Sequence, residues 1–170
     1  MAESARALEA AGADFIVITC NDVHRFVPAI APSLSIPFLH IAHETAKAIK
    51  AGGFGRAAIL GVRKTMEGDF YPEILCRYGI EAIIPDEVQK ASIHDSIYAD
   101  LVRNRFTDDT RARYVSIIDA LRARGADCVI FACTEIPLLL SPEQSPLPAF
   151  STTELHCAAA VEVALMTRAP

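Results

Sequence analysis

Residues 125–133 read GADCVIFAC, a short turn followed by a continuous apolar run that ends in a thiol. Residues 12–20 read GADFIVITC and repeat this order, with the cysteine eight positions after the glycine in both segments. Each segment follows a stretch rich in Ala, Arg and Leu and is followed by two polar residues. Such apolar runs are typical of strands buried on both faces of a parallel sheet. The repetition indicates two related helix–strand units; the alternative is a chance likeness, since Gly-Ala-Asp is a common turn into a strand.

Helical patterns and apolar runs alternate along the rest of the chain. We expect helices at residues 4–11, 44–51, 86–102, 108–124 and 153–166, a helix beginning at Thr65, and strands at 15–20, 37–41, 56–61, 80–85, 128–133 and near 149–150. Strands separated by helices of this length pair in parallel, which predicts an α/β fold. The predicted lobes are residues 1–47 plus 150–170, the N-terminal lobe, and residues 48–149, the C-terminal lobe.

Composition excludes several classes of protein. The 170 residues carry 16 basic and 21 acidic side chains, a net charge of −5, with no dense Lys/Arg cluster, which argues against a nucleic-acid binder. The sequence has neither an apolar run that would span a membrane nor a secretory signal at its start. Five cysteines are few for a secreted disulfide scaffold, and an odd number of cysteines cannot all pair. We therefore expect a cytoplasmic protein.

The two repeated cysteines, Cys20 and Cys133, stand at the carboxyl ends of their predicted strands, where parallel α/β sheets bind ligands. A thiol beside a following helix N-terminus should ionise more readily than a free cysteine. Thiols that approach one carbon from opposite sides suit stereoinversion by proton removal and return, without PLP or metal. The adjacent Asn21 and Thr134 are candidate hydrogen-bond donors to the carbanion. The alternative is that both thiols are inert core groups.

Several segments together resemble the aspartate/glutamate racemase family: residues 12–21, 36–41 (IPFLHI), 64–71 (KTMEGDFY), 132–139 (ACTEIPLL) and 150–156 (FSTTELH). The resemblance implies two pseudo-symmetric α/β lobes with a site between them and a cofactor-independent amino-acid racemase or epimerase. It implies a small carboxylate or amino acid as substrate and a homodimer. Cys20 and Cys133 would be the acid/base residues. The substrate-binding residues would be Asn21, Asp22, Gly61, Val62, Thr65, Thr134, Glu135 and His156.

The sequence departs from the family pattern in four places. Members usually begin earlier, with a strand and a glycine-rich turn, so we expect a truncated N-terminal lobe. Asp22 stands where the family has Thr, Val62 replaces a Thr, and Ser151 replaces an Asp. A carboxylate at position 22 opposes a dicarboxylate substrate. The alternatives are a related hydantoin racemase, maleate isomerase or arylmalonate decarboxylase, and a catalytically silent family member.

The remaining cysteines have structural interpretations. Cys128 lies an odd number of positions from Cys133 and should face the core, and Cys76 and Cys157 are expected to be packing residues on helices. Because no Cys-x-x-Cys pair occurs, we expect no metal site.

Overall fold

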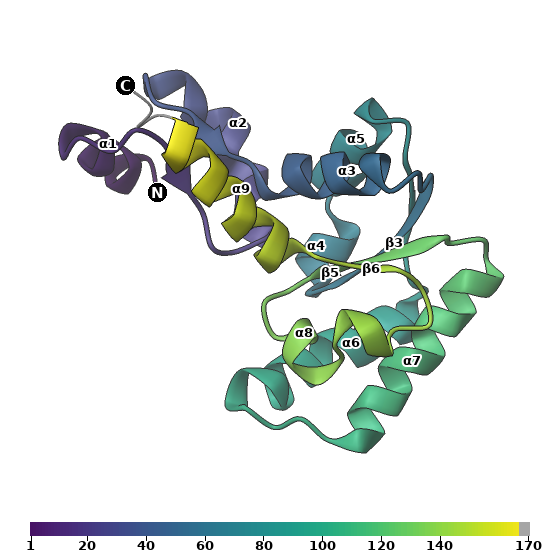
Figure 1. Cartoon of the computed structure of the whole chain (residues 1–170). Coiled ribbons are helices and arrows are strands. Elements are labelled where there is room, and N and C mark those ends of the chain that lie inside the picture. Colours follow the sequence, from purple (N-terminus) through teal and green to yellow (C-terminus); the bar gives the residue numbers. More distant parts are fainter. Residues whose placement is uncertain (167–170) are drawn as a thin grey trace.

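A computed structural model describes residues 1–166 of the chain. Figure 1 shows its helices and strands. In chain order they are α1 (Ala2–Ala10), β1 (Ile16–Val17), η1 (Asp22–Phe26), α2 (Val27–Ile30), η2 (Ala31–Ser33), β2 (Phe38–Leu39), α3 (Ile41–Ala51), β3 (Arg56–Gly61), α4 (Arg63–Glu67), α5 (Phe70–Arg77), β4 (Glu81–Ile83), α6 (Glu87–Ala99), η3 (Leu101–Arg103), α7 (Asp108–Ala123), β5 (Cys128–Ala132), α8 (Ile136–Leu139), η4 (Pro142–Gln144), β6 (Ala149–Ser151) and α9 (Thr152–Met166).

The larger sheet has four parallel strands in the order β4-β3-β5-β6. Its central pair, β3 and β5, runs in register from Ala57 opposite Cys128 to Gly61 opposite Ala132. Successive side chains of a strand point to opposite faces of the sheet. The apolar side chains of β3 and β5 therefore contribute to two hydrophobic cores, one on each face. Leu60 and Phe131 face α6 and α7, whereas Ile59 and Ile130 face α3 and α5. The α/β fold with parallel sheets is therefore confirmed, and helices cover both faces of the larger sheet (Figure 1).

The smaller sheet pairs β1 with β2 in parallel, with Ile16 opposite Phe38. The predicted strands at 15–20 and 37–41 were too long. The His40 side chain accepts a hydrogen bond from the Ala42 backbone N–H and caps α3, so β2 ends at Leu39 and α3 starts three residues before the predicted Glu44. With so short a partner, β1 pairs over only two residues.

Helix α9 connects the two sheets. It begins directly after β6 of the larger sheet and reaches the smaller one, where the His156 ring nitrogen Nε2 lies 2.9 Å from the Leu39 carbonyl oxygen. The predicted lobe boundaries at residues 47 and 150 fall within α3 and β6, so this division stays a prediction.

The structure also locates the structural cysteines. Cys128 is fully buried, as expected of a core residue. Cys76 and Cys157 are exposed, so their prediction as packing residues was wrong: each lies on the outward side of its helix. Within residues 1–166 no helix is both long and apolar enough to cross a membrane.

Candidate active site

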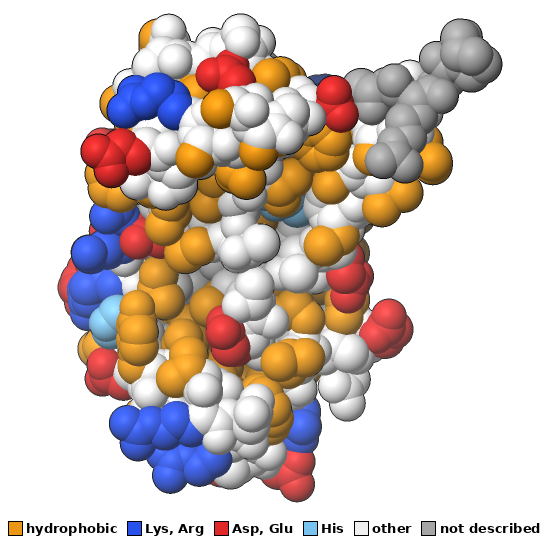
Figure 2. All heavy atoms as spheres, turned by 90° about the vertical axis from the view of Figure 1, so that its left-hand side faces the viewer, with side chains coloured by type: hydrophobic (Ala, Val, Ile, Leu, Met, Phe, Trp, Pro, Cys, Tyr) orange, Lys and Arg blue, Asp and Glu red, His pale blue; other side chains and the backbone are white. Residues whose placement is uncertain are grey.

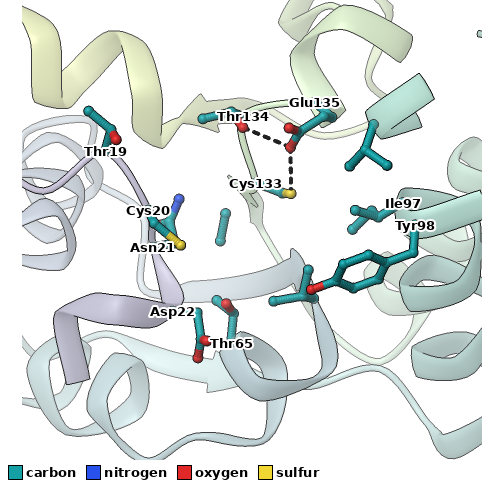
Figure 3. A pocket seen from close by; sticks show the side chains of 13 residues that line it. Thr19, Cys20, Asn21, Asp22, Thr65, Ile97, Tyr98, Cys133, Thr134 and Glu135 are labelled. Carbon is teal, nitrogen blue, oxygen red and sulfur yellow. Dashed lines mark hydrogen bonds between the residues drawn. The ribbon is translucent and has the colours of Figure 1, made fainter. Parts of the chain in front are cut away.

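A pocket of about 210 Å³ lies between the segment that follows β1 and the carboxyl ends of β3 and β5 (Figure 3). Its volume is below the roughly 300–1,000 Å³ of pockets for drug-sized ligands, which suits a small metabolite. The lining residues are Thr19, Cys20, Asn21, Asp22, Val62, Thr65, Ile97, Tyr98, Val102, Ala132, Cys133, Thr134 and Glu135. All the predicted site residues except Gly61 and His156 therefore line one pocket.

The two repeated cysteines reach this pocket from different sheets. Cys20 follows β1 and is exposed, whereas Cys133 follows β5 and is partly buried. In Figure 3 both sulfur atoms border the same hollow, Cys20 from the side of the N-terminal segment and Cys133 from the side of the larger sheet. The arrangement places two thiols where one small ligand can contact both.

Glu135 controls the environment of the Cys133 thiol. Cys133 Sγ donates a hydrogen bond to Glu135 Oε2 at 2.9 Å, and Thr134 Oγ1 donates to the same oxygen at 2.7 Å. Burial raises the pKa of Cys133 to about 12, and the carboxylate of Glu135 adds to this rise. The expectation that this thiol ionises readily was therefore wrong, because α8 is a single turn and the nearest charge is negative.

The ionisation of Glu135 is consistent with this arrangement. Burial acts to raise its pKa, but the hydrogen bonds from Cys133 and Thr134 outweigh burial and lower the pKa. At neutral pH the pair is therefore a protonated thiol beside a carboxylate. Negative charge on Cys20 raises the pKa of Cys133 further, so the two sulfurs disfavour being thiolates together.

The Asn21 side chain makes buried structural bonds. Its Nδ2 donates to Thr152 Oγ1 at 3.0 Å, and its Oδ1 accepts from Tyr71 Oη at 2.5 Å. Thr152 in turn donates to the Phe131 carbonyl oxygen at 3.0 Å. Asn21 thus ties the Cys20 segment to α5, α9 and β5, and its contribution to the site is to position Cys20.

Thr65 on α4 carries a polar atom beside the pocket that has no hydrogen-bond partner within residues 1–166. Its side chain is fully buried and lines the pocket, and among the described residues its Oγ1 has no hydrogen-bond partner. Gly61, the last residue of β3 and four positions before Thr65, lies next to the pocket-lining Ala132. A Cβ atom there would come within 2.8 Å of the Ala132 carbonyl oxygen, so glycine lets β3 and β5 approach at the pocket floor.

His156 lies away from the pocket, in a cluster with His24 and His40 that we call the histidine cluster. The His24 ring centroid lies 4.9 Å from that of His40 and 5.4 Å from that of His156. His24 Nδ1 donates to the Cys20 carbonyl oxygen at 2.9 Å. The cluster therefore supports the backbone of Cys20. The His156 ring lies against the Leu39 carbonyl oxygen and outside the pocket lining, so its role in substrate binding stays a prediction.

The wall that sequence reasoning missed comes from α6 and η3: Ile97, Tyr98 and Val102. An ion pair of 3.0 Å between Lys90 Nζ and Glu67 Oε1 holds α6 against α4. The sequence shows that residues 86–102 form a helix but carries no signal that this helix ends over the two cysteines.

The pocket contains acidic and neutral side chains. Asp22 and Glu135 line it, and no Lys, Arg or His among residues 1–166 does so. Asp22 pairs with Arg25, which lies outside the lining. Figure 2 shows this side of the molecule, with basic side chains toward its margins and mostly hydrophobic and uncharged surface at its middle. In the described part of the chain no group of His, Cys, Asp or Glu is placed to hold a metal ion.

Comparison with known proteins adds independent evidence. Residues 1–160 match the family model described as Asp/Glu/hydantoin racemase. The broad specificity amino-acid racemase RacX of Bacillus subtilis is 32% identical over 141 residues, which are 83% of this chain and 60% of RacX. The chain thus spans about three fifths of the length of that relative.

Solved structures with the same fold include one from Yersinia pestis, described as an Asp/Glu racemase, and an aspartate racemase homologue from Pyrococcus horikoshii. The Yersinia structure superposes with a TM-score of 0.90 at 37% identity and covers 96% of this chain and 72% of its own. The Pyrococcus structure gives a TM-score of 0.87 at 27% identity with the same coverage.

Proposed function

The chain belongs to the Asp/Glu/hydantoin racemase family, and we propose that it is a PLP-independent amino-acid racemase that moves the α-proton between Cys20 and Cys133. The observation that carries this proposal is that the two thiols, from corresponding positions of the sequence repeat, border one small pocket. A racemase needs an acid and a base on opposite faces of the α-carbon. Two thiols favour this chemistry over a decarboxylation that uses one.

The protonation states suit a defined first step. Cys133 enters as the thiol, because burial and Glu135 raise its pKa. In this direction Cys20, which is exposed, acts as the base: its sulfur takes the α-proton, and the C–H electron pair passes into the substrate carboxylate. The Cys133 thiol then gives its proton to the opposite face. Cys20 ends as a thiol and Cys133 as a thiolate, so the reverse reaction starts from this form.

Other pocket groups supply the binding contacts. The substrate carboxylate accepts a hydrogen bond from the unpartnered Thr65 hydroxyl, which stabilises the charge that develops during proton removal. Asp22 receives the α-ammonium group with the oxygen that Arg25 leaves free. Among residues 1–166 no lysine lines the pocket that could form a Schiff base with PLP, which supports a reaction without this cofactor.

The cellular setting and assembly are further proposals. All five cysteines are free, which supports a reducing compartment such as the cytoplasm. A homodimer is proposed from the family resemblance, and sedimentation analysis would test it.

The test is incorporation of deuterium at the α-carbon of L- and D-amino acids in D2O. We expect incorporation and loss of optical activity with the wild-type chain. Cys20→Ala and Cys133→Ala should each abolish racemisation, whereas Cys76→Ala, at an exposed cysteine outside the pocket, should leave it unchanged. A folded wild-type protein that racemises no amino acid would establish the silent alternative. Wild-type activity in the Cys20→Ala or Cys133→Ala variant would establish another mechanism.

A further inference from the structure

One side of the pocket is a hydrophobic wall formed by Val62, Ile97, Tyr98 and Val102. Tyr98 and Val102 are 55% and 49% exposed, an unusual state for large apolar groups that line a concave surface. In Figure 3 the Tyr98 ring extends from α6 toward the side of the pocket that holds Thr65. These side chains offer a ligand contacts without charge.

The wall is held in place by contacts behind it. The His94 ring lies against that of Tyr98, with 4.9 Å between centroids, and its Nδ1 accepts a hydrogen bond of 3.1 Å from the Arg63 backbone N–H. That N–H is at the start of α4, which also carries Thr65. These contacts therefore fix the hydrophobic wall relative to the Thr65 hydroxyl, which is proposed to bind the substrate carboxylate.

The charges of the pocket exclude an acidic side chain on the ligand. Both charged lining groups, Asp22 and Glu135, are carboxylates, and no cation in the described chain faces the pocket. A second carboxylate on the substrate would meet like charge without a counter-ion, which weakens its binding. In the proposed reaction Asp22 binds the α-ammonium group, and Glu135 accepts hydrogen bonds from Cys133 and Thr134. Neither carboxylate therefore remains to pair with a cationic side chain on the substrate.

We propose that the substrate is an amino acid with a hydrophobic, uncharged side chain that packs on Val62, Ile97, Tyr98 and Val102. This inference rests on the racemase function proposed above. The side chain of aspartate or glutamate would bring a second carboxylate into a pocket whose charged lining groups are Asp22 and Glu135.

The experiment measures α-deuterium incorporation from D2O into leucine, methionine and phenylalanine, compared with aspartate, glutamate, lysine and arginine. We expect the hydrophobic set to exchange at least about tenfold faster than either charged set, since like-charge contacts and unpaired charges each cost more than the 1.4 kcal/mol of a tenfold change. Fastest exchange of aspartate or glutamate, or of lysine or arginine, would overturn the inference.

A matched pair of variants sharpens the test. Val102→Lys places a cation on the hydrophobic wall and should raise glutamate exchange relative to leucine by at least about tenfold. Val88→Lys adds the same charge at an exposed residue of α6 outside the pocket and should leave the ratio unchanged. An equal effect of both variants would contradict a role for this wall in selectivity.

Failure of the inference can be separated from failure of the proposed function. If no amino acid incorporates deuterium at its α-carbon, the racemase proposal fails. The class of amino acid that the pocket accepts is then decided by a binding measurement. Ligand-observed NMR with leucine and with glutamate should then show leucine bound, and competition by a reagent that alkylates Cys20 should displace it. Preferential binding of glutamate would overturn the inference.

Discussion

Cys133 and Glu135 show how one local contact determines the state of a reactive group. They are separated by one residue, and their side chains meet because the chain turns from β5 into α8. A carboxylate beside a buried thiol opposes formation of the thiolate. The same contact therefore keeps Cys133 protonated at rest.

Replacing Glu135 with Gln should make Cys133 ionise more easily. The amide keeps the shape of the side chain but removes the negative charge that raises the pKa of Cys133. We expect the midpoint of the pH profile for Cys133 alkylation, followed by mass spectrometry, to fall by about one unit. Glu143→Gln, at an exposed carboxylate away from the pocket, is the control. A profile that Glu135→Gln leaves unmoved would show that burial alone sets the thiol's acidity.

At this scale the sequence predicted the residues next to the repeat and, through the family resemblance, Val62 and Thr65. It missed the side chains that α6 and η3 contribute. The equal spacing from Gly12 to Cys20 and from Gly125 to Cys133 indicated two thiols at strand ends. Tyr98 could not be found in this way, because its place in the pocket depends on where α6 ends in space. Helical periodicity reports only which side chains are apolar.

Among the elements, the histidine cluster joins η1, the start of α3 and α9. The rings of His24 and His156 are buried, and that of His40 is partly buried. Burial lowers the pKa of His24 and of His40 to about 4, although the hydrogen bond from His24 to the Cys20 carbonyl oxygen acts in the opposite direction for His24. His24 Nε2 is buried and has no partner within residues 1–166, so a second proton there would be unpaired. Acid therefore weakens the contacts that support Cys20.

This cluster predicts a pH-dependent stability. Between pH 6.5 and pH 4 the unfolded chain protonates His24 while the folded chain keeps it neutral, so the free energy of unfolding falls as the pH falls. The loss is roughly 3 kcal/mol for His24 alone. Urea denaturation across this range should give a smaller slope for His24→Gln than for the wild type. Equal slopes for His24→Gln and the wild type would refute the assignment.

The Asn21 bridge also acts between elements, since it joins the Cys20 segment to α5 and α9. Asn21→Leu should lower the free energy of unfolding by about 3 kcal/mol, because it leaves the buried Tyr71 and Thr152 hydroxyls without this partner. In an urea titration, Tyr71→Phe should cost clearly less in the Asn21→Leu background than in the wild type. If the losses in unfolding free energy of the two substitutions simply add, the hydrogen bond between Tyr71 and Asn21 does not stabilise the fold.

Strands were predicted with unequal success for a physical reason. β3 and β5 pair over five residues and lie at the centre of two cores, so their continuous apolar runs correspond to real strands. β1 and β2 have comparable sequences but end early, because the His40 cap starts α3. Apolar runs identify a strand, but the ends depend on the partner strand and on nearby caps.

For the whole molecule, the chemistry depends on how the two sheets are joined. α9 runs between them, and the Asn21 bridge and the histidine cluster both connect to it, through Thr152 and His156. The sequence repeat predicted two related units, and the long-range contacts that bring their strand ends to one pocket became visible only in the structure. The central claim is that the sulfur atoms of Cys20 and Cys133 face each other across that pocket.

The most direct measurement is chemical bridging of the two sulfurs, which needs no knowledge of the substrate. The protein would carry Cys76→Ser and Cys157→Ser, which remove the exposed thiols outside the pocket, and would react with a short bifunctional alkylating reagent at alkaline pH, where Cys133 ionises. We expect mass spectrometry to find one product that links Cys20 to Cys133 within a chain, absent when Cys20→Ser is added. Separate single adducts at Cys20 and Cys133, with no bridged product, would contradict the shared pocket.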